Sequence, residues 1–234
     1  MELSKLLSIV IPCKNELRIV DTTLTLLNHQ DNIENVNVIV ADSSTDNTTF
    51  ELESRVSDKF NLKVIQGGLP SIARNNGSKY VTTPYILFLD ADMFILDNSL
   101  LSESVGKMIN ENLHLLTTKV RTTNGEYNYT YKSFDVIQKI IKPITPFCLG
   151  GFMLFNTEVF NRLGGFDESV KVAEDYLLSK KVKPNKFKII NKHIFTSPRR
   201  FKNKGVLYMT KLMIQSFIHR NNKQFFLKHN TYWK

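Results

Sequence analysis

The sequence predicts an α/β protein built on a doubly wound, mostly parallel sheet. Short apolar runs typical of buried strands alternate, over the first 90 residues, with segments whose apolar residues recur at helical spacing. Polar residues gather directly after several of these strands. Strand–helix–strand alternation implies parallel strands joined by right-handed crossovers, with helices on both faces of the sheet.

Each element in this alternation has its own signal. The helices are expected after residue 16, where Val20, Leu24 and Leu27 share one face, after residue 48, where Leu52, Val56 and Phe60 recur every four residues, and from Ile72 to about residue 81. Gly67-Gly68 ends the third strand. The expected strands are the apolar runs at 7–12, 36–40, 62–65 and 85–89.

The strand at 85–89 ends in two carboxylates, Asp90 and Asp92, separated by one residue. Side chains two residues apart in an extended segment face the same way, so both carboxylates can reach one hard cation such as Mg²⁺ or Mn²⁺. Ligands in open α/β sheets bind outside the carboxyl ends of the strands. The pair therefore indicates a metal–nucleotide site, although such pairs also occur as ordinary loop or N-cap residues.

Six short motifs along the chain together resemble those of family 2 glycosyltransferases with the GT-A fold. The resemblance extends from residue 7 to about residue 180. In order, the motifs are SIVIPCKNE at 8–16, DSSTDNT at 42–48, ARNNG at 73–77, DAD at 90–92, GGFDE at 164–168 and ED at 174–175.

The resemblance implies a role for several of these residues. Asp92 would bind the metal and Asp90 the metal shell or the ribose, while Asp175, beside Glu174, would act as the catalytic base. An acidic pair at a helix start, such as Glu174-Asp175, is also commonly found because it interacts favourably with the helix dipole.

The resemblance further places six residues near the nucleotide: Pro12, Asn15, Glu16, Asp42, Arg74 and Asn75. Arg74 and Asn75 could instead cap a helix.

Two further groups lie beyond the motifs. His193 follows Asp175 by 18 residues, and some GT-A enzymes use a histidine near here as a third metal ligand, although a lone histidine is more often structural. Arg199 and Arg200 could clamp a phosphate through paired hydrogen bonds, or they could simply be solvated.

The implied reaction is inverting, metal-dependent transfer of one sugar from a nucleotide-diphosphate sugar, such as a UDP- or GDP-sugar, to a hydroxyl acceptor, with Mn²⁺ or Mg²⁺ as cofactor. In the segment around Asp42, the family often has two acidic residues and a glycine, whereas Asp42 alone can recognise the base or ribose in this chain. The Gln-x-x-Arg-Trp motif of processive synthases is missing, and the only tryptophan is Trp233. A single addition is therefore expected rather than polymerisation.

Charge is distributed unevenly along the chain. From Tyr176 onward there are 15 Lys or Arg residues and no Asp or Glu, whereas the chain up to Asp175 carries a net charge of −6. We therefore divide the chain into a GT-A domain at 1–205 and a basic amphipathic helical segment at 206–234. Either this segment lies on an anionic membrane that carries a lipid-linked or glycan acceptor, or its apolar stripe packs on the domain. The stripe comprises Val206, Met209, Leu212, Met213 and Phe217.

The composition suggests a cytoplasmic protein, peripheral to a membrane if the basic segment binds one. Cys13 and Cys148 form no disulfide framework or metal-binding cluster. The segment before the first strand is too short and polar for a signal peptide, and no apolar stretch approaches the ~20 residues of a spanning helix.

Two other classes of protein remain as alternatives. A net charge of +9 is compatible with a nucleic-acid-binding protein, but the aromatic residues do not interleave with the basic ones and no zinc spacing is present. A sugar-phosphate nucleotidyltransferase would also use carboxylates and a metal. Such enzymes usually carry a glycine-rich basic signature after the first strand, where this chain has Pro12-Cys13-Lys14-Asn15-Glu16. Because the aromatic and basic residues do not interleave and zinc spacing is missing, we expect no nucleic-acid partner.

Overall fold

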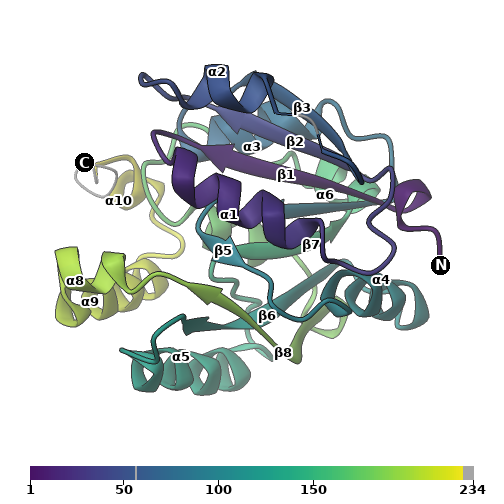
Figure 1. Cartoon of the computed structure of the whole chain (residues 1–234). Helices are drawn as coiled ribbons and strands as arrows, with labels where there is room; N and C mark the ends of the chain where they lie inside the picture. Colours follow the sequence, from purple (N-terminus) through teal and green to yellow (C-terminus); the bar gives the residue numbers. More distant parts are fainter. Residues whose placement is uncertain (56, 229–234) are drawn as a thin grey trace.

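The computed structural model describes residues 1–55 and 57–228, which form one sheet with helices on both faces (Figure 1). Its strands are β1 (Leu7–Cys13), β2 (Asn37–Asp42), β3 (Asn61–Gln66), β4 (Tyr85–Leu89), β5 (Met93–Phe94), β6 (Leu115–Thr122), β7 (Phe152–Asn156) and β8 (Phe187–Thr196). The order across the sheet is β3-β2-β1-β4-β7-β6-β8-β5. β7 is antiparallel to β4 and β6, β5 is antiparallel to β8, and the other pairs are parallel. The predicted mostly parallel sheet is confirmed.

The helices follow the strands in the expected alternation through β4. They are α1 (Leu17–Leu27), α2 (Thr48–Glu53), α3 (Pro70–Ser78), α4 (Leu100–Asn110), α5 (Asn128–Ile141), α6 (Thr157–Arg162), α7 (Glu174–Ser179), α8 (Arg199–Lys204), α9 (Val206–Ile218) and α10 (Lys223–Lys228), with short 3-10 turns at Leu3–Lys5 and Pro184–Lys186.

Two apolar layers hold the helices to the sheet. Ile9 and Ile11 of β1 point into a core shared with α1, α2 and α4, whereas Val10 points into a second core shared with α6 and α7. Alternate residues of one strand thus serve opposite faces, as the pleat requires. The sheet is buried on both sides, which explains why its strands are continuous apolar runs rather than alternating ones.

Helix α3 approaches the second face of the sheet so closely that one position must be glycine. A Cβ atom built on Gly77 would lie 2.3 Å from Cγ1 of Val10. The absence of a side chain lets α3 lie directly against β1. This close packing fixes the start of α3 next to the carboxyl ends of β1 and β4.

The second predicted helix is shorter than its spacing suggested. α2 ends at Glu53, and Phe60 is buried just before β3 rather than on a helix. Val56 lies outside the described residues. Two apolar residues eight positions apart are compatible with a helix or with a loop that folds back, and tertiary packing selected the loop.

The described part of the basic segment, residues 206–228, packs on the domain. Leu212 and Phe226 form a small core with Val170 and Val172, and the backbone N–H of Lys171 donates to the carbonyl of Phe226 at 2.9 Å. Trp233 lies outside the described residues. None of the helices in the described part of the chain is long and apolar enough to cross a bilayer.

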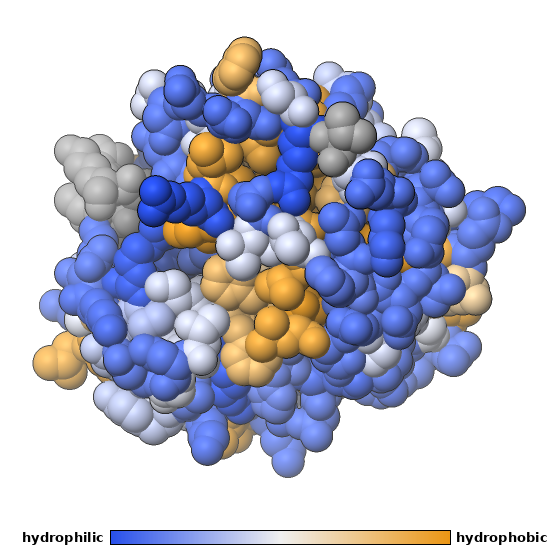
Figure 2. All heavy atoms as spheres, in the orientation of Figure 1, coloured by the Kyte–Doolittle hydropathy of each residue, from blue (hydrophilic) through white to orange (hydrophobic). Residues whose placement is uncertain are grey.

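The surface is mainly hydrophilic on the face that Figure 2 shows, with apolar side chains gathered near its middle. Most of the strand residues themselves are buried. The functional groups are therefore to be sought where the sheet ends rather than on its faces.

Candidate active site

A cleft of about 590 Å³ lies at the carboxyl ends of β1 and β4. The strand order reverses here, because the chain runs from β1 outward to β3 and then returns to place β4 on the other side of β1. Such a switch point is where open α/β sheets bind ligands. The predicted residues that line the cleft are Pro12, Glu16, Arg74, Asp90, Asp92, Arg199 and Arg200.

Arg74 joins the floor of this cleft to the predicted catalytic helix. Its Nη2 donates to Oδ1 of Asp90 at 2.6 Å, and its Nη1 donates to Oε1 of Glu174 at 2.7 Å. The side chain of Arg74 is 2% exposed. Burial lowers the pKa of Arg74, but the two carboxylates more than offset this and raise it above its ordinary value. One buried cation therefore holds the end of β4 and the start of α7 together.

Asp175 lies beside this network with its carboxylate held by backbone groups. Oδ2 accepts a hydrogen bond from the N–H of Gly150 and Oδ1 accepts one from the N–H of Tyr176, both at 2.7 Å. A Cβ on Gly150 would come within 2.9 Å of Oδ2, so the glycine permits this approach. Burial, and then the negative charge of Glu174, raise the pKa of Asp175 to about 6. A carboxylate with a pKa near 6 is suited to accept a proton at neutral pH.

Asp92 provides the second carboxylate at the end of β4. Burial raises its pKa, Arg200 lowers it, and the neighbouring carboxylates of Asp90 and Glu16 raise it further. The hydroxyl of Thr196 lies 3.4 Å from Oδ2 of Asp92. A divalent cation would offset the cost of placing these negative charges together.

The donor set fits a hard cation only if a ligand completes the shell. Asp90 and Asp92 offer carboxylate oxygens, which Mg²⁺ and Mn²⁺ prefer, and a bound diphosphate can supply the other ligands. Within residues 1–55 and 57–228, no group of three or more His, Cys, Asp or Glu side chains could hold a metal. The residues present therefore fit a metal that arrives with, or is completed by, a phosphorylated ligand.

Arginines of α8 form the opposite wall of the cleft. Arg199 forms an ion pair with Glu16 across the cleft. The positive charge of Arg200 lowers the pKa of Asp92. Phe201 anchors this short helix, because its ring stacks on Tyr127 and packs edge-on against Tyr131, each at 5.3 Å between centroids. The basic wall is therefore fixed by aromatic contacts to the start of α5.

His193 is not placed to serve as a metal ligand. It lies in β8 opposite Lys119, and burial followed by the charges of Arg121 and Lys119 lowers its pKa. The strand register puts it three residues before Thr196, which is the β8 residue that reaches Asp92. The predicted third ligand is therefore not confirmed by the geometry.

Three other predicted nucleotide contacts are not among the residues that line the cleft. Asn75 uses its amide to hold the backbone of Phe166 and the carboxylate of Glu168. Asn15 bonds the loop at Ser44 and Thr45, in both cases at 2.7–2.8 Å.

Asp42, the third of these residues, is 3% exposed and accepts hydrogen bonds from the hydroxyls of Ser44 and Thr49. Like Asn15 and Asn75, it has polar partners within the protein. Their contact with a nucleotide stays a prediction.

The cleft is also lined by residues to which the sequence analysis assigned no role. These are Cys13, Lys14, Ser43, Gly68, Leu69, Pro70, Ala91, Asn203 and Lys204. Several lie directly beside predicted positions, so the strand-end rule could have found them. Asn203 and Lys204 had no signal in the sequence except their proximity to Arg199 and Arg200. Gly150, which contacts Asp175, belongs to a Gly-Gly pair that could have been taken as a close backbone approach.

Comparisons with known proteins identify a family and a shared fold. A sequence model of the family described as "Glycosyl transferase family 2" matches residues 8–164. The chain is 32% identical over 90 residues to validoxylamine A glucosyltransferase of Streptomyces hygroscopicus subsp. jinggangensis, a match that covers 36% of this chain and 21% of that protein.

Solved structures share the fold. S. aureus TarS 1-349 in complex with UDP-GlcNAc has a TM-score of 0.65 at 23% identity, over 82% of this chain and 58% of that one. The mannosyltransferase PcManGT from Pyrobaculum calidifontis, in complex with GDP-Man and Mn²⁺, has a TM-score of 0.68 at 18% identity, over 89% and 64%. These likenesses confirm the GT-A fold. The chain spans less than two thirds of the length of each of these relatives.

The Arg74 network leads to a stability prediction. Arg74→Met should lower the free energy of unfolding by about 3–5 kcal/mol, because it leaves the carboxylates of Asp90 and Glu174 close together without their cation. Denaturant unfolding measures this loss. Arg162→Met is the matched control, since Arg162 pairs with Glu158 on the surface at 3.5 Å and should change stability by less than about 1 kcal/mol. Equal effects of the two substitutions would contradict the role assigned to Arg74.

Proposed function

Because the chain belongs to glycosyltransferase family 2, we propose that it transfers one sugar from a nucleotide-diphosphate sugar to a hydroxyl acceptor, with inversion. The observation that carries this proposal is the relation between the cleft and a second cavity. Arg74, Asp90 and Arg200 line both spaces, and Asp175 lines only the second. A donor in the cleft would thus meet an acceptor in the second cavity beside a carboxylate that can take a proton.

The cleft suits the diphosphate part of such a donor. Arg199 and Arg200 form one wall, Lys14 lies on the β1 side, and Asp90 and Asp92 lie between them. We assign Mn²⁺ or Mg²⁺ to Asp92, with Asp90 in its shell. When bound, the cation would stabilise the charge that develops on the departing diphosphate. The arginines would contribute to the same stabilisation through charge-assisted hydrogen bonds.

The acceptor side depends on Asp175. Its carboxylate would take the proton of the acceptor hydroxyl as the oxygen bonds to the anomeric carbon and the bond from that carbon to the diphosphate breaks. Attack from the face opposite the leaving group inverts the configuration. Glu174 is held by Arg74 and acts as a positioning residue that also raises the pKa of Asp175.

The two alternatives have less support. The family match over residues 8–164 favours sugar transfer above nucleotidyl transfer and above nucleic-acid binding. The basic side chains Arg199 and Arg200 line a cleft with three carboxylates, Glu16, Asp90 and Asp92. Such a mixture suits a metal–diphosphate more than a nucleic-acid backbone.

Donor binding should require both a divalent cation and Asp92. Calorimetry with UDP-, GDP-, CDP- and TDP-sugars in Mn²⁺ should identify a donor, whose affinity should fall about 10–100-fold or more in Asp92→Asn. EDTA should cause a similar loss in the unsubstituted protein. Asp31→Asn removes a carboxylate from an exposed position and is the control. Unchanged donor affinity in EDTA would exclude the metal role. In a separate assay, release of pyrophosphate from a nucleoside triphosphate and a sugar phosphate would identify the protein as a nucleotidyltransferase.

Turnover should depend on the ionisation of Asp175. With its pKa raised to about 6, the base is protonated at lower pH, so the transfer rate should fall about tenfold per pH unit below 6 and level off above it. Asp175→Asn should lower the rate by ~10²-fold or more and remove this pH limb, with donor affinity little changed.

A separate measurement distinguishes a poised base from a merely structural carboxylate. Because the folded-state pKa of Asp175 is raised, its ionisation opposes folding, and the stability it contributes is lost as pH rises through about 6. Asp175→Asn should therefore raise Tm at pH 7.5, and the gain should shrink toward pH 4. Asp58→Asn, at an exposed position, should do neither. A loss of Tm at pH 7.5 would show that the carboxylate stabilises the fold instead.

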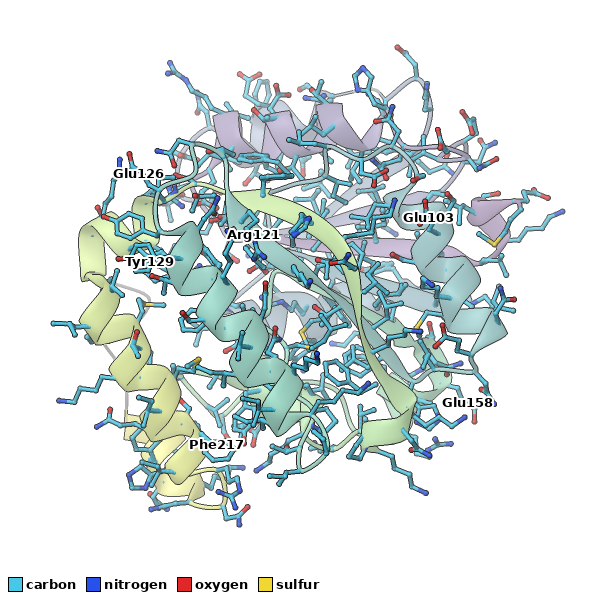
Figure 3. The ribbon with its side chains drawn as sticks, turned by 90° about the horizontal axis from the view of Figure 1, so that it is seen from below. Glu103, Arg121, Glu126, Tyr129, Glu158 and Phe217 are labelled. Atoms are coloured by element: carbon cyan, nitrogen blue, oxygen red, sulfur yellow. The ribbon has the colours of Figure 1, made fainter. Side chains whose placement is uncertain are left out.

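We also propose that the protein rests on an anionic membrane at its cytosolic face. Helices α5 and α9 lie side by side (Figure 3), and apolar residues are exposed on both: Val136 and Ile140 on α5, and Leu207, Ile214 and Ile218 on α9. Lys132, Lys139 and Lys211 are exposed on the same two helices. Exposed apolar and basic residues on one pair of helices are typical of an interfacial surface.

Co-sedimentation with vesicles tests this membrane surface. The protein should pellet with anionic vesicles more than with neutral ones, and less at high salt. Lys211→Gln should weaken binding to anionic vesicles about fivefold, since a basic residue near such a bilayer contributes ~1 kcal/mol. Lys59→Gln, at an exposed position before β3, is the matched control. Equal pelleting of the two variants, or equal pelleting with neutral vesicles, would contradict the proposal.

A further inference from the structure

A second cavity of about 270 Å³ adjoins the cleft and is apolar over most of its wall. Helix α5 provides Phe134 and Ile137, helix α9 provides Met213 and Phe217, and the segment before β7 provides Phe147. The acidic residues that line it are Asp90, Glu174 and Asp175, of which Asp90 also lines the cleft. The cavity thus has a charged end beside the base and an apolar remainder.

The apolar wall restricts what can occupy this cavity. A glycan would bring several hydroxyl groups that lose their water on entry, and each unpaired group would cost binding free energy. The hydroxyl of Ser216 is already used, since it donates to the carbonyl of Leu212 at 2.8 Å. A single hydroxyl placed at Asp175, joined to an apolar chain along Ile137 and Met213, would match both parts of the wall.

One side of the cavity leads to the surface. Ile214 lines the cavity and is also 50% exposed. Ile218 and Leu207 lie four residues after and seven residues before it, so the three share one outward face of α9. An apolar chain longer than the cavity would therefore emerge onto an apolar part of the surface rather than into water.

We propose that this cavity is the acceptor subsite, and that it takes the hydrocarbon chain of a hydroxyl-bearing lipid. The proposal rests on the function proposed above and names the class of its acceptor. The predicted apolar stripe of the basic segment then has a specific use, because Met209, Leu212, Met213 and Phe217 all line the cavity. These four residues of the stripe line the proposed acceptor subsite, Ile214 lies at its edge and is half exposed, and Leu207 and Ile218 are exposed.

Calorimetric binding of n-octyl β-D-glucoside below its micelle concentration, compared with methyl β-D-glucoside, tests the subsite without a sugar donor. The octyl compound should bind at least about tenfold more tightly, since each buried methylene group adds to affinity. Ile137→Asn should remove that advantage. Ile109→Asn is the matched control, because Ile109 of α4 is 44% exposed, does not line the cavity and is not part of the proposed membrane surface.

The outcomes separate this inference from the proposed function. Equal binding of the two glucosides, or equal losses in Ile137→Asn and Ile109→Asn, would overturn the lipid subsite. The affinity for the nucleotide-sugar donor should be the same in Ile137→Asn and in the unsubstituted protein. If neither protein binds any nucleotide sugar, the result contradicts the proposed function rather than the lipid subsite. If Ile137→Asn does not fold, Met213→Gln on the opposite wall should give the same loss of octyl glucoside binding.

Discussion

The guanidinium of Arg74 is the contact on which the rest of the site depends. It comes from α3, on one side of the sheet switch point, and binds Asp90 at the end of β4 and Glu174 at the start of α7. A buried cation between two carboxylates is costly to form and more costly to leave incomplete. The three elements are therefore held in one arrangement, and the cleft and the second cavity keep a common boundary.

The pairing of Arg74 with two carboxylates also leaves excess negative charge in the site. Arg74 is occupied by Asp90 and Glu174, so it does not fully neutralise Asp175, whose pKa is raised by burial and by Glu174. Asp92 has a raised pKa for a similar reason, with Arg200 as the main opposing charge. A metal–diphosphate, if bound as proposed, would relieve the excess negative charge near Asp92, while Asp175 would keep its raised pKa.

The basic C-terminal part of the chain contributes apolar packing as well as positive charge. α8 brings Arg199 and Arg200 to the cleft, and α9 closes the apolar cavity with residues that a sequence pattern would equally assign to a membrane. Met209, Met213 and Phe217 line the cavity, whereas Leu207 and Ile218 of the same helix are exposed. Under the two proposals above, one segment would bind the acceptor chain on its inner side and meet a bilayer on its outer side.

The sequence by itself determined the strand–helix alternation, the mostly parallel sheet and the strand-end carboxylates Asp90 and Asp92, because these follow from local periodicity and from where strands end. It also placed Asp175, through its resemblance to a family. Only the tertiary structure decided that Asn75 holds the backbone of Phe166, that Glu174 pairs with an arginine 100 residues away, and that residues of the apolar stripe of α9 line a cavity. These outcomes depend on which side chains meet across the fold, and spacing along one strand or helix carries no information about such distant partners.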